Sequence, residues 1–355
     1  MKLTNTFKYF SLESNCGEKL MGCTVVAGAF WGDEGKGKVI SYLALKDKVD
    51  VCVRTGSVNA AHTVHFKGRR YALHMVPSTF VYDKCRLLIG PGANVDVFQF
   101  LKEVRETGVE SRIGVDRQAS IIEPHHSAID KSDSHLKSLG TTGRGVGPAV
   151  QERAKRSAKL AKDVAELKRF LADATGEVNA AIDAKKTVVL EGTQGLMLSL
   201  YHGSYPYVTS RDTSAAAICS ESGVGPSRVD KVLVVFKAFI TRVGAGDLPG
   251  ELSKEEAIRR RWFETAAGTG RDRRSAPFNF NLARRVAKIH GATEAAVTKL
   301  DILYPSCKNA TSYDKLPQGA RDFLVRVEEA TGVPVTIVGT GPGALDIIDR
   351  RGSSS

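Results

Sequence analysis

The chain has 355 residues, of which 42% are apolar and 25% are charged, and its formal net charge at pH 7 is +12. This length suits one large α/β domain or two ordinary domains, and no apolar run approaches the roughly 20 residues of a membrane span. A chain this basic binds either nucleic acid or small anions. Because its arginines lie beside glycines, with few aromatic residues for base stacking, we favour small anionic ligands and expect neither nucleic acid nor a membrane as a partner.

The first twenty residues contain no apolar segment of the kind found in secretory signals. We expect residues 1–20 to be a poorly ordered extension and residues 21–355 to form the folded domain. The six cysteines are scattered without a Cys-x-x-Cys pair, which argues against a local zinc site and against a disulfide framework. We therefore expect a cytoplasmic protein.

Apolar, β-branched runs alternate with helical patterns along the chain. The predicted strands are 24–29, 51–53, 87–89, 188–190, 232–239, 295–298 and 335–338. The predicted helices are 95–106, 163–184, 253–263 and 316–329. This alternation predicts an α/β fold, a single large domain with a mostly parallel central sheet flanked by helices. Such sheets bind ligands beyond the carboxyl ends of their strands.

The segment WGDEGKGK, residues 31–38, follows the first predicted strand and precedes a helical pattern. Gly32, Gly37 and Lys38 have the spacing of a phosphate-binding loop, but Val39 stands where such a loop has the hydroxyl that holds magnesium. A strand, glycine loop and helix together present backbone N–H groups to phosphate. The segment therefore predicts a phosphate site that lacks the usual metal ligand.

Two acids and two lysines distinguish this loop from a plain glycine turn, which is the structural alternative. A turn needs neither Lys36 nor Lys38, whereas a phosphate site uses both. Asp33 and Glu34 would repel a polyphosphate unless one of them binds the metal directly in place of the missing hydroxyl. An acid here could also take a proton from a substrate that lies beside the nucleotide.

WGDEGKGK is similar to the signature of the adenylosuccinate synthetase family, GTP-dependent ligases that join IMP and aspartate. Further segments match this family in order over residues 21–351: NAAHT (59–63), GTTGRGVGP (140–148), EGTQG (191–195), YPYVTS (205–210), TRVGAG (241–246), GTGRDRR (268–274), TKLD (298–301) and GTGP (339–342). The chain lacks insertions of the usual bacterial members and resembles the shorter archaeal type. The resemblance implies a P-loop-like GTP-binding ligase fold.

The resemblance implies two catalytic residues and one metal ion per subunit. Asp33 is the implied general base, which removes the N1 proton of IMP so that O6 attacks the γ-phosphate. His62 is implied to donate a hydrogen bond or proton as charge builds on the transferred group. Mg²⁺ is the implied cofactor, with Asp33 and the backbone carbonyl of Ala61 as protein ligands. The family has glycine at the position of Ala61.

The resemblance also assigns residues to the three substrates. The implied GTP-binding residues are Gly32, Asp33, Glu34, Gly35, Lys36, Gly37, Lys38, Ala61, His62, Thr63, Arg273, Lys299, Leu300, Asp301, Gly339, Thr340 and Gly341. The implied IMP-binding residues are Asp33, Glu34, Gly35, Lys36, Asn59, Ala60, Ala61, His62, Thr142, Arg156, Gln194, Thr209 and Arg271. The implied aspartate-binding residues are Ala267, Gly268, Thr269, Gly270, Arg271 and Arg273.

Two of these sets suit their ligands chemically. Arg271 and Arg273 present planar forks that match a dicarboxylate better than lysine does, although the loop departs from the family at Gly268 and Asp272. Asp301 can accept hydrogen bonds from guanine N1–H and the 2-amino group, and the aliphatic stem of Lys299 can stack on the base. Taken alone, a Lys-x-Asp triplet is weak support for a nucleotide site.

The implied reaction has two steps in the first committed stage of AMP synthesis from IMP: phosphorylation of IMP at O6, then displacement of phosphate by the amine of aspartate. Two other functions compete. Phage relatives condense dGMP with aspartate, but they lack an acid at the position of Asp33. A guanine-nucleotide switch would need no arginine lid. Arg156 is implied to reach the IMP of the neighbouring subunit, which predicts a homodimer; by itself it would fit a solvated helix face.

Overall fold

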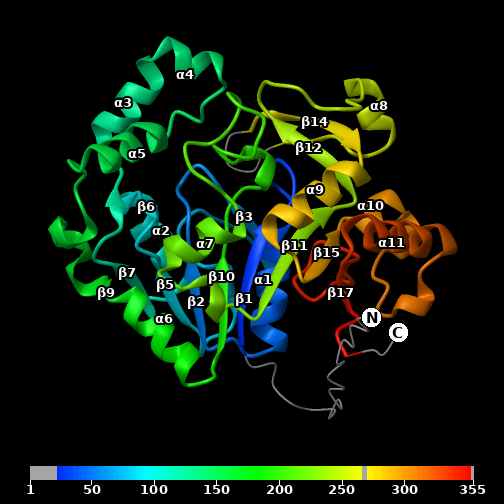
Figure 1. Cartoon of the computed structure of the whole chain (residues 1–355), viewed down its shortest axis with the longest axis horizontal. Coiled ribbons are helices and arrows are strands. Elements are labelled where there is room, and N and C mark those ends of the chain that lie inside the picture. Colours follow the sequence, from blue (N-terminus) through cyan, green and yellow to red (C-terminus); the bar gives the residue numbers. More distant parts are fainter. Residues whose placement is uncertain (1–21, 266–269, 353–355) are drawn as a thin grey trace, which may run out of the picture.

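The computed structural model describes residues 22–265 and 270–352, so the predicted extension at 1–20 lies outside the described residues. A ten-stranded sheet forms the centre of the molecule (Figure 1). Its strands, in spatial order, are β17 (Ile347–Asp349), β16 (Val335–Gly339), β15 (Glu294–Thr298), β11 (Lys231–Lys237), β1 (Gly22–Gly28), β10 (Thr187–Glu191), β2 (Val51–Arg54), β5 (Arg86–Ile89), β7 (Ile113–Asp116) and β9 (Leu171–Ala172). Neighbouring strands run parallel except β16 and β17. The predicted mostly parallel sheet is confirmed.

Helices cover both faces of this sheet. One face packs against α1 (Lys36–Lys46) and α2 (Val97–Thr107). The other face packs against α6 (Ala174–Asp183), α7 (Ala215–Ser222), α9 (Phe280–His290) and α11 (Gln318–Thr331). Along β1, Val26 belongs to the first core, whereas Val25 and Ala27 belong to the second. Both faces are therefore buried, which is why the parallel strands read as continuous apolar runs.

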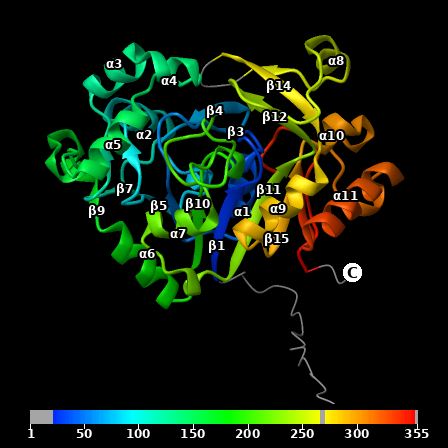
Figure 2. The ribbon, with the colours of Figure 1, turned by 45° about the horizontal axis from the view of Figure 1, so that its top comes forward.

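Smaller elements stand beyond the carboxyl ends of the central strands. One group is α3 (Pro124–Ser132), α4 (Ser134–Ser138) and α5 (Val146–Lys155); the other is an antiparallel sheet of β12 (Phe239–Val243), β14 (Asp272–Pro277) and β13 (Glu264–Thr265), with α8 (Lys254–Arg259) beside it. Figures 1 and 2 both show the two groups at the same edge of the molecule. They frame the end of the sheet where ligands of α/β proteins bind.

The remaining elements are short. They are the hairpin of β3 (His62–Phe66) and β4 (Arg69–Leu73), the pair β6 (Asn94–Val95) and β8 (Ser120–Ile121), helix α10 (Leu300–Leu303), and the 3₁₀ helices Ser78–Val81, Ala161–Asp163, Ala165–Phe170, Leu196–Leu198, Pro226–Arg228, Pro305–Cys307 and Tyr313–Lys315. Within residues 22–265 and 270–352, none of the helices combines the length and the apolarity that crossing a bilayer requires.

Two of the predicted elements differ from the structure in kind, and others differ only in their bounds. The predicted strand 232–239 is divided, because β11 ends at Lys237 and Phe239 begins β12 in another sheet. The predicted helix 163–184 is wrong in its first half, where 3₁₀ turns and β9 precede α6. Burial of Phe170 and the pairing of Leu171 with Val115 hold that half against the sheet, and the Asp173 carboxylate then caps α6. Helix 253–263 ends earlier, at Arg259, and helix 316–329 is shifted to 318–331.

Candidate active site

A cavity of about 780 Å³ opens at the carboxyl ends of the central strands, between the α3–α5 group and the β12–β14 sheet. This is the size of pockets that hold small molecules. The predicted site residues that line it are Gly32, Asp33, Gly35, Lys36, Gly37, Lys38, Asn59, Ala60, Ala61, His62, Thr63, Thr142, Gln194, Thr209, Arg271, Arg273, Lys299 and Gly341. Segments spread over more than 300 residues of sequence therefore meet in one place.

The glycine loop is held by Glu34, whose side chain is buried. Its Oε1 accepts hydrogen bonds from the backbone N–H groups of Phe30 (3.0 Å) and Gly32 (2.8 Å), and its Oε2 lies 2.7 Å from the ammonium of Lys36. This acid therefore fixes the loop from behind instead of facing a polyphosphate. The predicted participation of Glu34 in GTP and IMP binding would have to come from its backbone.

Helix α1 begins directly at this loop. Gly35 precedes it with φ of +85°, a left-handed conformation that favours glycine, and a Cβ at Gly37 would lie 3.0 Å from the His62 side chain. The ammonium of Lys36 also donates to the Gln194 carbonyl at 2.5 Å. The free N–H groups of the first helical turn thus lie in the cavity wall, where they can bind phosphate.

Lys38 connects this loop to the segment after β16. Its ammonium donates to the carbonyl oxygens of Gly341 (2.5 Å) and Asp346 (2.6 Å). Burial lowers the pKa of Lys38 to about 8, with Asp346 and Asp301 opposing the shift. The predicted phosphate lysine is therefore at the boundary between the phosphate region and the predicted guanine region.

Asp33 occupies the strained position of the loop, with φ of 60°. Its carboxylate is 33% exposed, and its Oδ2 pairs with Arg273 Nη2 at 2.8 Å. Burial raises the pKa of Asp33, while Arg273 and Lys237 oppose that shift. A carboxylate bound to a metal ion has a low pKa, so the raised pKa here reflects the protein surroundings alone.

His62 is buried beside a carboxylate that the sequence patterns did not assign a role. Its Nδ1 lies 2.6 Å from Glu191 Oε1, whereas its Nε2 is buried without a hydrogen-bond partner. Burial, and next the charge of Arg54, lowers the pKa of His62 to about 4. The neutral ring therefore donates Nδ1–H to Glu191 and leaves Nε2 unprotonated, so Nε2 can donate to a ligand only after the ring takes up a proton. A bound phosphate would add negative charge nearby and raise the pKa of the ring.

Glu191 is in turn fixed by buried partners. Arg54 Nη1 donates to its Oε1 at 2.5 Å, and Ser78 donates to it through both its hydroxyl and its backbone N–H, each at 2.7 Å. Burial alone would raise the pKa of Glu191, but Arg54, His62 and Ser78 together lower it to about 2. The only sequence signal was its place at the head of EGTQG, directly after the predicted strand 188–190, which in the structure extends to Glu191.

A second ionic cluster surrounds Glu264 on β13. This carboxylate lies 2.7 Å from Lys237 Nζ, 2.9 Å from Arg273 Nη1 and 3.2 Å from Lys299 Nζ. Burial raises the pKa of Glu264, but Lys237 and Lys299, followed by Arg273, lower it to about 2. Sequence reasoning missed both Glu264 and Lys237, because neither belongs to the residues assigned by a motif.

The predicted aspartate loop is described from residue 270 onward, so Ala267, Gly268 and Thr269 lie outside the described residues. Arg271 Nη1 donates to the carbonyl of Gly140 at 2.9 Å, while its buried Nε has no hydrogen-bond partner. Asp272 is exposed and pairs with Lys254 at 2.6 Å. Asp272 therefore does not line the cavity.

The predicted IMP residues Asn59 and Thr209 approach each other, with 3.5 Å between Nδ2 and Oγ1. Gln194 adopts φ of 63°, another left-handed residue at the cavity. Arg242, which lay in a matched motif but received no role, is buried in the cavity wall. It donates to the carbonyl of Asp247 at 2.7 Å and lies over the ring of Trp31. Arg242 thus forms a fixed part of the cavity wall.

In the predicted guanine region, Asp301 has a buried side-chain oxygen without a partner, although Asp301 is not among the residues that line the cavity. Its Oδ1 is buried and forms no hydrogen bond, as expected of a group that meets a base. Leu300 is fully buried in the core, and the Thr340 hydroxyl donates to the carbonyl of Ala310 at 3.0 Å. Neither of these two side chains lines the cavity, nor does Gly339.

Arg156 is another predicted site residue that does not line the cavity. It follows the last residue of α5, with φ of 67°, and its side chain is exposed. Exposure is the arrangement expected if it serves a neighbouring subunit, and it is equally that of a solvated helix end.

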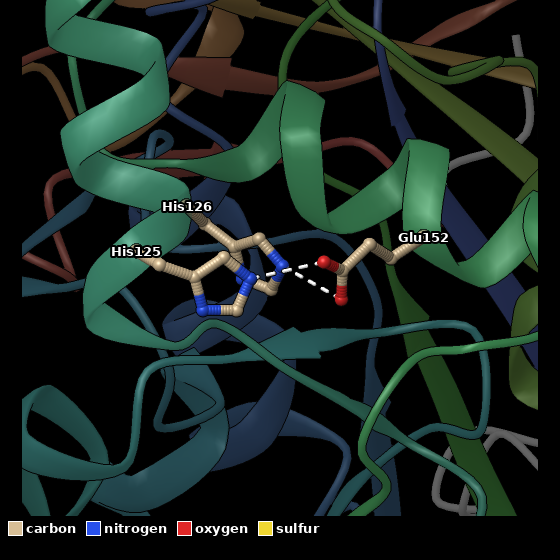
Figure 3. Close-up of side chains that lie close together, drawn as sticks. All are labelled: His125, His126 and Glu152. Atoms are coloured by element: carbon tan, nitrogen blue, oxygen red, sulfur yellow. Dashed lines mark hydrogen bonds and ion pairs between the residues drawn. The ribbon is translucent and has the colours of Figure 1, made fainter.

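Near Arg156, the side chains of His125, His126 and Glu152 gather between α3 and α5 (Figure 3). His125 Nε2 lies 2.9 Å from one carboxylate oxygen, and His126 Nε2 lies 3.0 Å from the other, though without the geometry of a hydrogen bond. His126 Nδ1 accepts the backbone N–H of Glu123 at 2.9 Å, so the proton of its neutral ring sits on Nε2. A protonated Nε2 cannot bind a metal ion. We interpret this cluster as a polar clamp between the two helices.

The oxygen atoms implied for Mg²⁺ belong to residues of the cavity. This ion prefers oxygen ligands and keeps several waters. Asp33 is partly exposed to the cavity, and Ala61 lines it. Ala61 is not among the residues with positive φ, so alanine in place of the family glycine introduces no left-handed strain. The donor set therefore fits the ion.

A parallel sheet that presents helix-terminal amides, a carboxylate and a histidine to one cavity belongs to the class of α/β enzymes that act on nucleotides. The sequence profile of the family Adenylosuccinate synthetase matches residues 25–170 and 158–306. The adenylosuccinate synthetase of Methanocaldococcus jannaschii is 48% identical over 337 residues, which are 94% of this chain and 98% of that protein. The chain belongs to the adenylosuccinate synthetase family, and it is a GTP-dependent ligase that joins IMP to aspartate in AMP synthesis.

Solved structures share this fold. The fully ligated adenylosuccinate synthetase of Plasmodium falciparum has a TM-score of 0.85 and 22% identity, over 92% of this chain and 99% of that chain. The cyanophage S-2L succinoaminodeoxyadenylate synthetase, solved with dGMP and dATP, has a TM-score of 0.79 and 22% identity, over 93% and 95%. At these identities the likeness concerns the fold alone, so it adds no support for a dGMP-condensing activity.

Proposed function

We propose that the ligation takes place in the cavity described above, with Asp33 as the general base and His62 as the group that stabilises the transferred phosphoryl. Asp33 would accept the N1 proton of IMP while O6 attacks the γ-phosphate of GTP, giving GDP and 6-phosphoryl-IMP. The amine of aspartate then displaces phosphate and forms adenylosuccinate. The observation that carries this proposal is the meeting of the two groups in one cavity, with the Nε2 of His62 lacking a partner.

The phosphates of GTP would lie against the N-terminus of α1. The first turn of α1 would supply its free backbone N–H groups there, and the buried pair of Glu34 and Lys36 holds the loop before it in place. Mg²⁺, held by Asp33 and the carbonyl of Ala61, would neutralise charge on the transferred phosphoryl. Because phosphoryl transfer depends mainly on positioning and charge, a rigid loop is the main contribution of the protein.

The arginines and Asp301 would bind the other two ligands. Arg271 and Arg273 each have an Nε without a partner, so both can turn an edge of their guanidinium group toward the carboxylates of aspartate. The partnerless Oδ1 of Asp301 would accept from guanine, and Lys299 would cover the base. These groups are left incompletely bonded by the protein, which is the property expected of residues that bind ligands.

Product analysis tests the function directly. The chain is incubated with IMP, aspartate, GTP and Mg²⁺, and the products are identified by mass spectrometry. We expect adenylosuccinate, GDP and phosphate in equal amounts, and none of them when IMP or aspartate is omitted. A parallel incubation with dGMP in place of IMP should give no condensation product. Formation of that product alone would assign the chain to the dGMP reaction.

We also propose that the enzyme is a homodimer in which Arg156 completes the neighbouring site. Arg156→Ala and Asp33→Asn should each be nearly inactive. After subunit exchange, one site of each hybrid dimer has both an intact Asp33 and an intact Arg156, so the mixture should regain about a quarter of wild-type activity. A mixture that stays inactive after exchange has been verified by mass spectrometry would contradict the shared site.

A further inference from the structure

The first observation concerns the pairing of β13 with β14. Glu264 lies directly opposite Arg273 in the antiparallel register, and Thr265 lies opposite Asp272. Side chains at directly opposite positions share one face of the sheet, so an acid and an arginine are placed together by the backbone itself. The arginine of the aspartate loop therefore has a partner that is built into the fold.

The second observation is that Glu264 uses both carboxylate oxygens for cations from three separate elements. Its Oε2 binds Lys237 at the end of β11 and Arg273 on β14, at 2.7 and 2.9 Å. Its Oε1 lies 3.2 Å from Lys299, the residue after β15. One carboxylate thus connects the predicted aspartate region with the predicted guanine region.

The three cations differ in how much freedom they have. Lys237 is 2% exposed and is held additionally by the Thr241 hydroxyl at 3.0 Å, so it is a fixed part of the protein interior. Lys299 is 45% exposed. Arg273 is 9% exposed and also pairs with Asp33 through its Nη2 at 2.8 Å, but its buried Nε has no partner. Lys299 and Arg273 line the cavity together with Glu264. Glu264 is therefore anchored on one side by Lys237 and holds two ligand-facing cations on the other.

We infer that Glu264 is a positioning residue, which holds Arg273 and Lys299 in the geometry that receives aspartate and GTP. The inference rests on the proposed roles of Arg273 and Lys299. Long flexible side chains lose conformational freedom when they bind a ligand, and an anchor in the free protein reduces that loss. Because one carboxylate anchors both cations, its removal should weaken the binding of both GTP and aspartate and leave the binding of IMP unchanged.

The experiment measures kcat and KM for each substrate in Glu264→Gln. The amide keeps the shape of the side chain but loses the charge. We expect KM for GTP and KM for aspartate to rise by roughly three- to tenfold, with KM for IMP and kcat changed by less than about twofold. An equal rise for all three substrates, or a loss confined to kcat, would overturn the inference.

A second variant separates positioning from neutralisation of the buried lysine. In Glu264→Gln the charge of Lys237 is left without its partner, and this alone could destabilise the protein. The double variant Glu264→Gln, Lys237→Met removes both charges. The two raised KM values should persist in it, since Arg273 and Lys299 still lack their anchor. Recovery of wild-type KM values in the double variant would show that Glu264 only neutralises Lys237.

Further variants distinguish a failure of this inference from a failure of the proposed function. Lys299→Met should raise KM for GTP, and adding Glu264→Gln should raise it little more, because the anchor acts through Lys299. If Lys299→Met leaves KM for GTP unchanged, the assigned role of Lys299 fails instead. Glu256→Gln, an exposed acid on α8 that pairs with two surface arginines, is the matched control and should leave all three KM values unchanged.

Discussion

Two carboxylates support the cavity, Glu191, which is fully buried, and Glu264, which is 19% exposed, and their partners differ in how free they are to bind a ligand. Glu191 binds Arg54, Ser78 and His62, and all of these residues are buried. Glu264 binds Lys237, which is also buried, but its other two cations line the cavity: Lys299 is 45% exposed, and the Nε of Arg273 has no partner.

The two clusters therefore have different functions. The Glu191 cluster has one arrangement, which sets the orientation of the His62 ring and leaves only its Nε2 for the reaction. The Glu264 cluster holds cations that must exchange a protein partner for a substrate. We therefore expect Glu191 to determine kcat and stability, and Glu264 to determine substrate affinity.

The largest expected effect lies at Asp33, which is paired with the Glu264 cluster through Arg273 but acts in the chemical step. Asp33→Asn should lower kcat by about 10²–10⁴-fold or more, because the amide cannot accept the N1 proton. Its melting temperature should stay close to that of the wild type, since the carboxylate is partly exposed. Near-normal kcat in the purified, folded variant would remove Asp33 from the mechanism.

The next effect concerns stability at Glu191. Glu191→Gln leaves the guanidinium of Arg54 buried without a countercharge, which should cost about 3–5 kcal/mol of unfolding free energy in urea titrations. The control is Glu110→Gln, which breaks an exposed pair with Arg169 and should cost less than about 1 kcal/mol. If the two variants unfold at the same urea concentration, the buried cluster does not hold the site as described.

A smaller effect, on nucleotide choice, tests the predicted guanine site. Asp301→Asn should lose about 10²-fold in kcat/KM for GTP, because an amide cannot accept from both N1–H and the 2-amino group. Xanthosine triphosphate carries a carbonyl in place of the 2-amino group, and the amide of the variant can donate to that carbonyl. Activity with xanthosine triphosphate should therefore increase. Asp322→Asn, on the exposed face of α11, is the control. Unchanged kcat/KM for GTP in Asp301→Asn would exclude this residue from the guanine site.

The smallest expected effect is on the unfolding free energy at acid pH, where Glu191 and Glu264 should behave alike. The pKa of each is lowered from 4.5 to about 2 in the folded chain. Their stabilisation is therefore complete above pH 4.5 and is lost as the pH falls toward 2. Glu191→Gln and Glu264→Gln should each reduce the slope of unfolding free energy in this window by about 1.4 kcal/mol per pH unit. An unchanged slope would mean that the carboxylate is not held ionised.

Much of the fold could be predicted because parallel strands buried on both faces are apolar throughout. The same property concealed the break at Ala238, since Phe236 and Phe239 are equally buried although they lie in different sheets. In residues 163–172, helical residue types fold as 3₁₀ turns and a strand, because tertiary burial outweighs weak local propensity.

The sequence by itself determined the glycine loop, because residues 31–38 interact over a few positions and carry their own backbone requirements. It also determined the family, because the matched segments follow one another in family order along the chain. The supporting acids were decided only by the tertiary structure. Arg54 and Glu191 are separated by 137 residues, and Lys237 and Glu264 by 27, so no spacing records their contact. A buried charge is stable only beside its countercharge, and which charges become buried neighbours is settled by how the strands assemble.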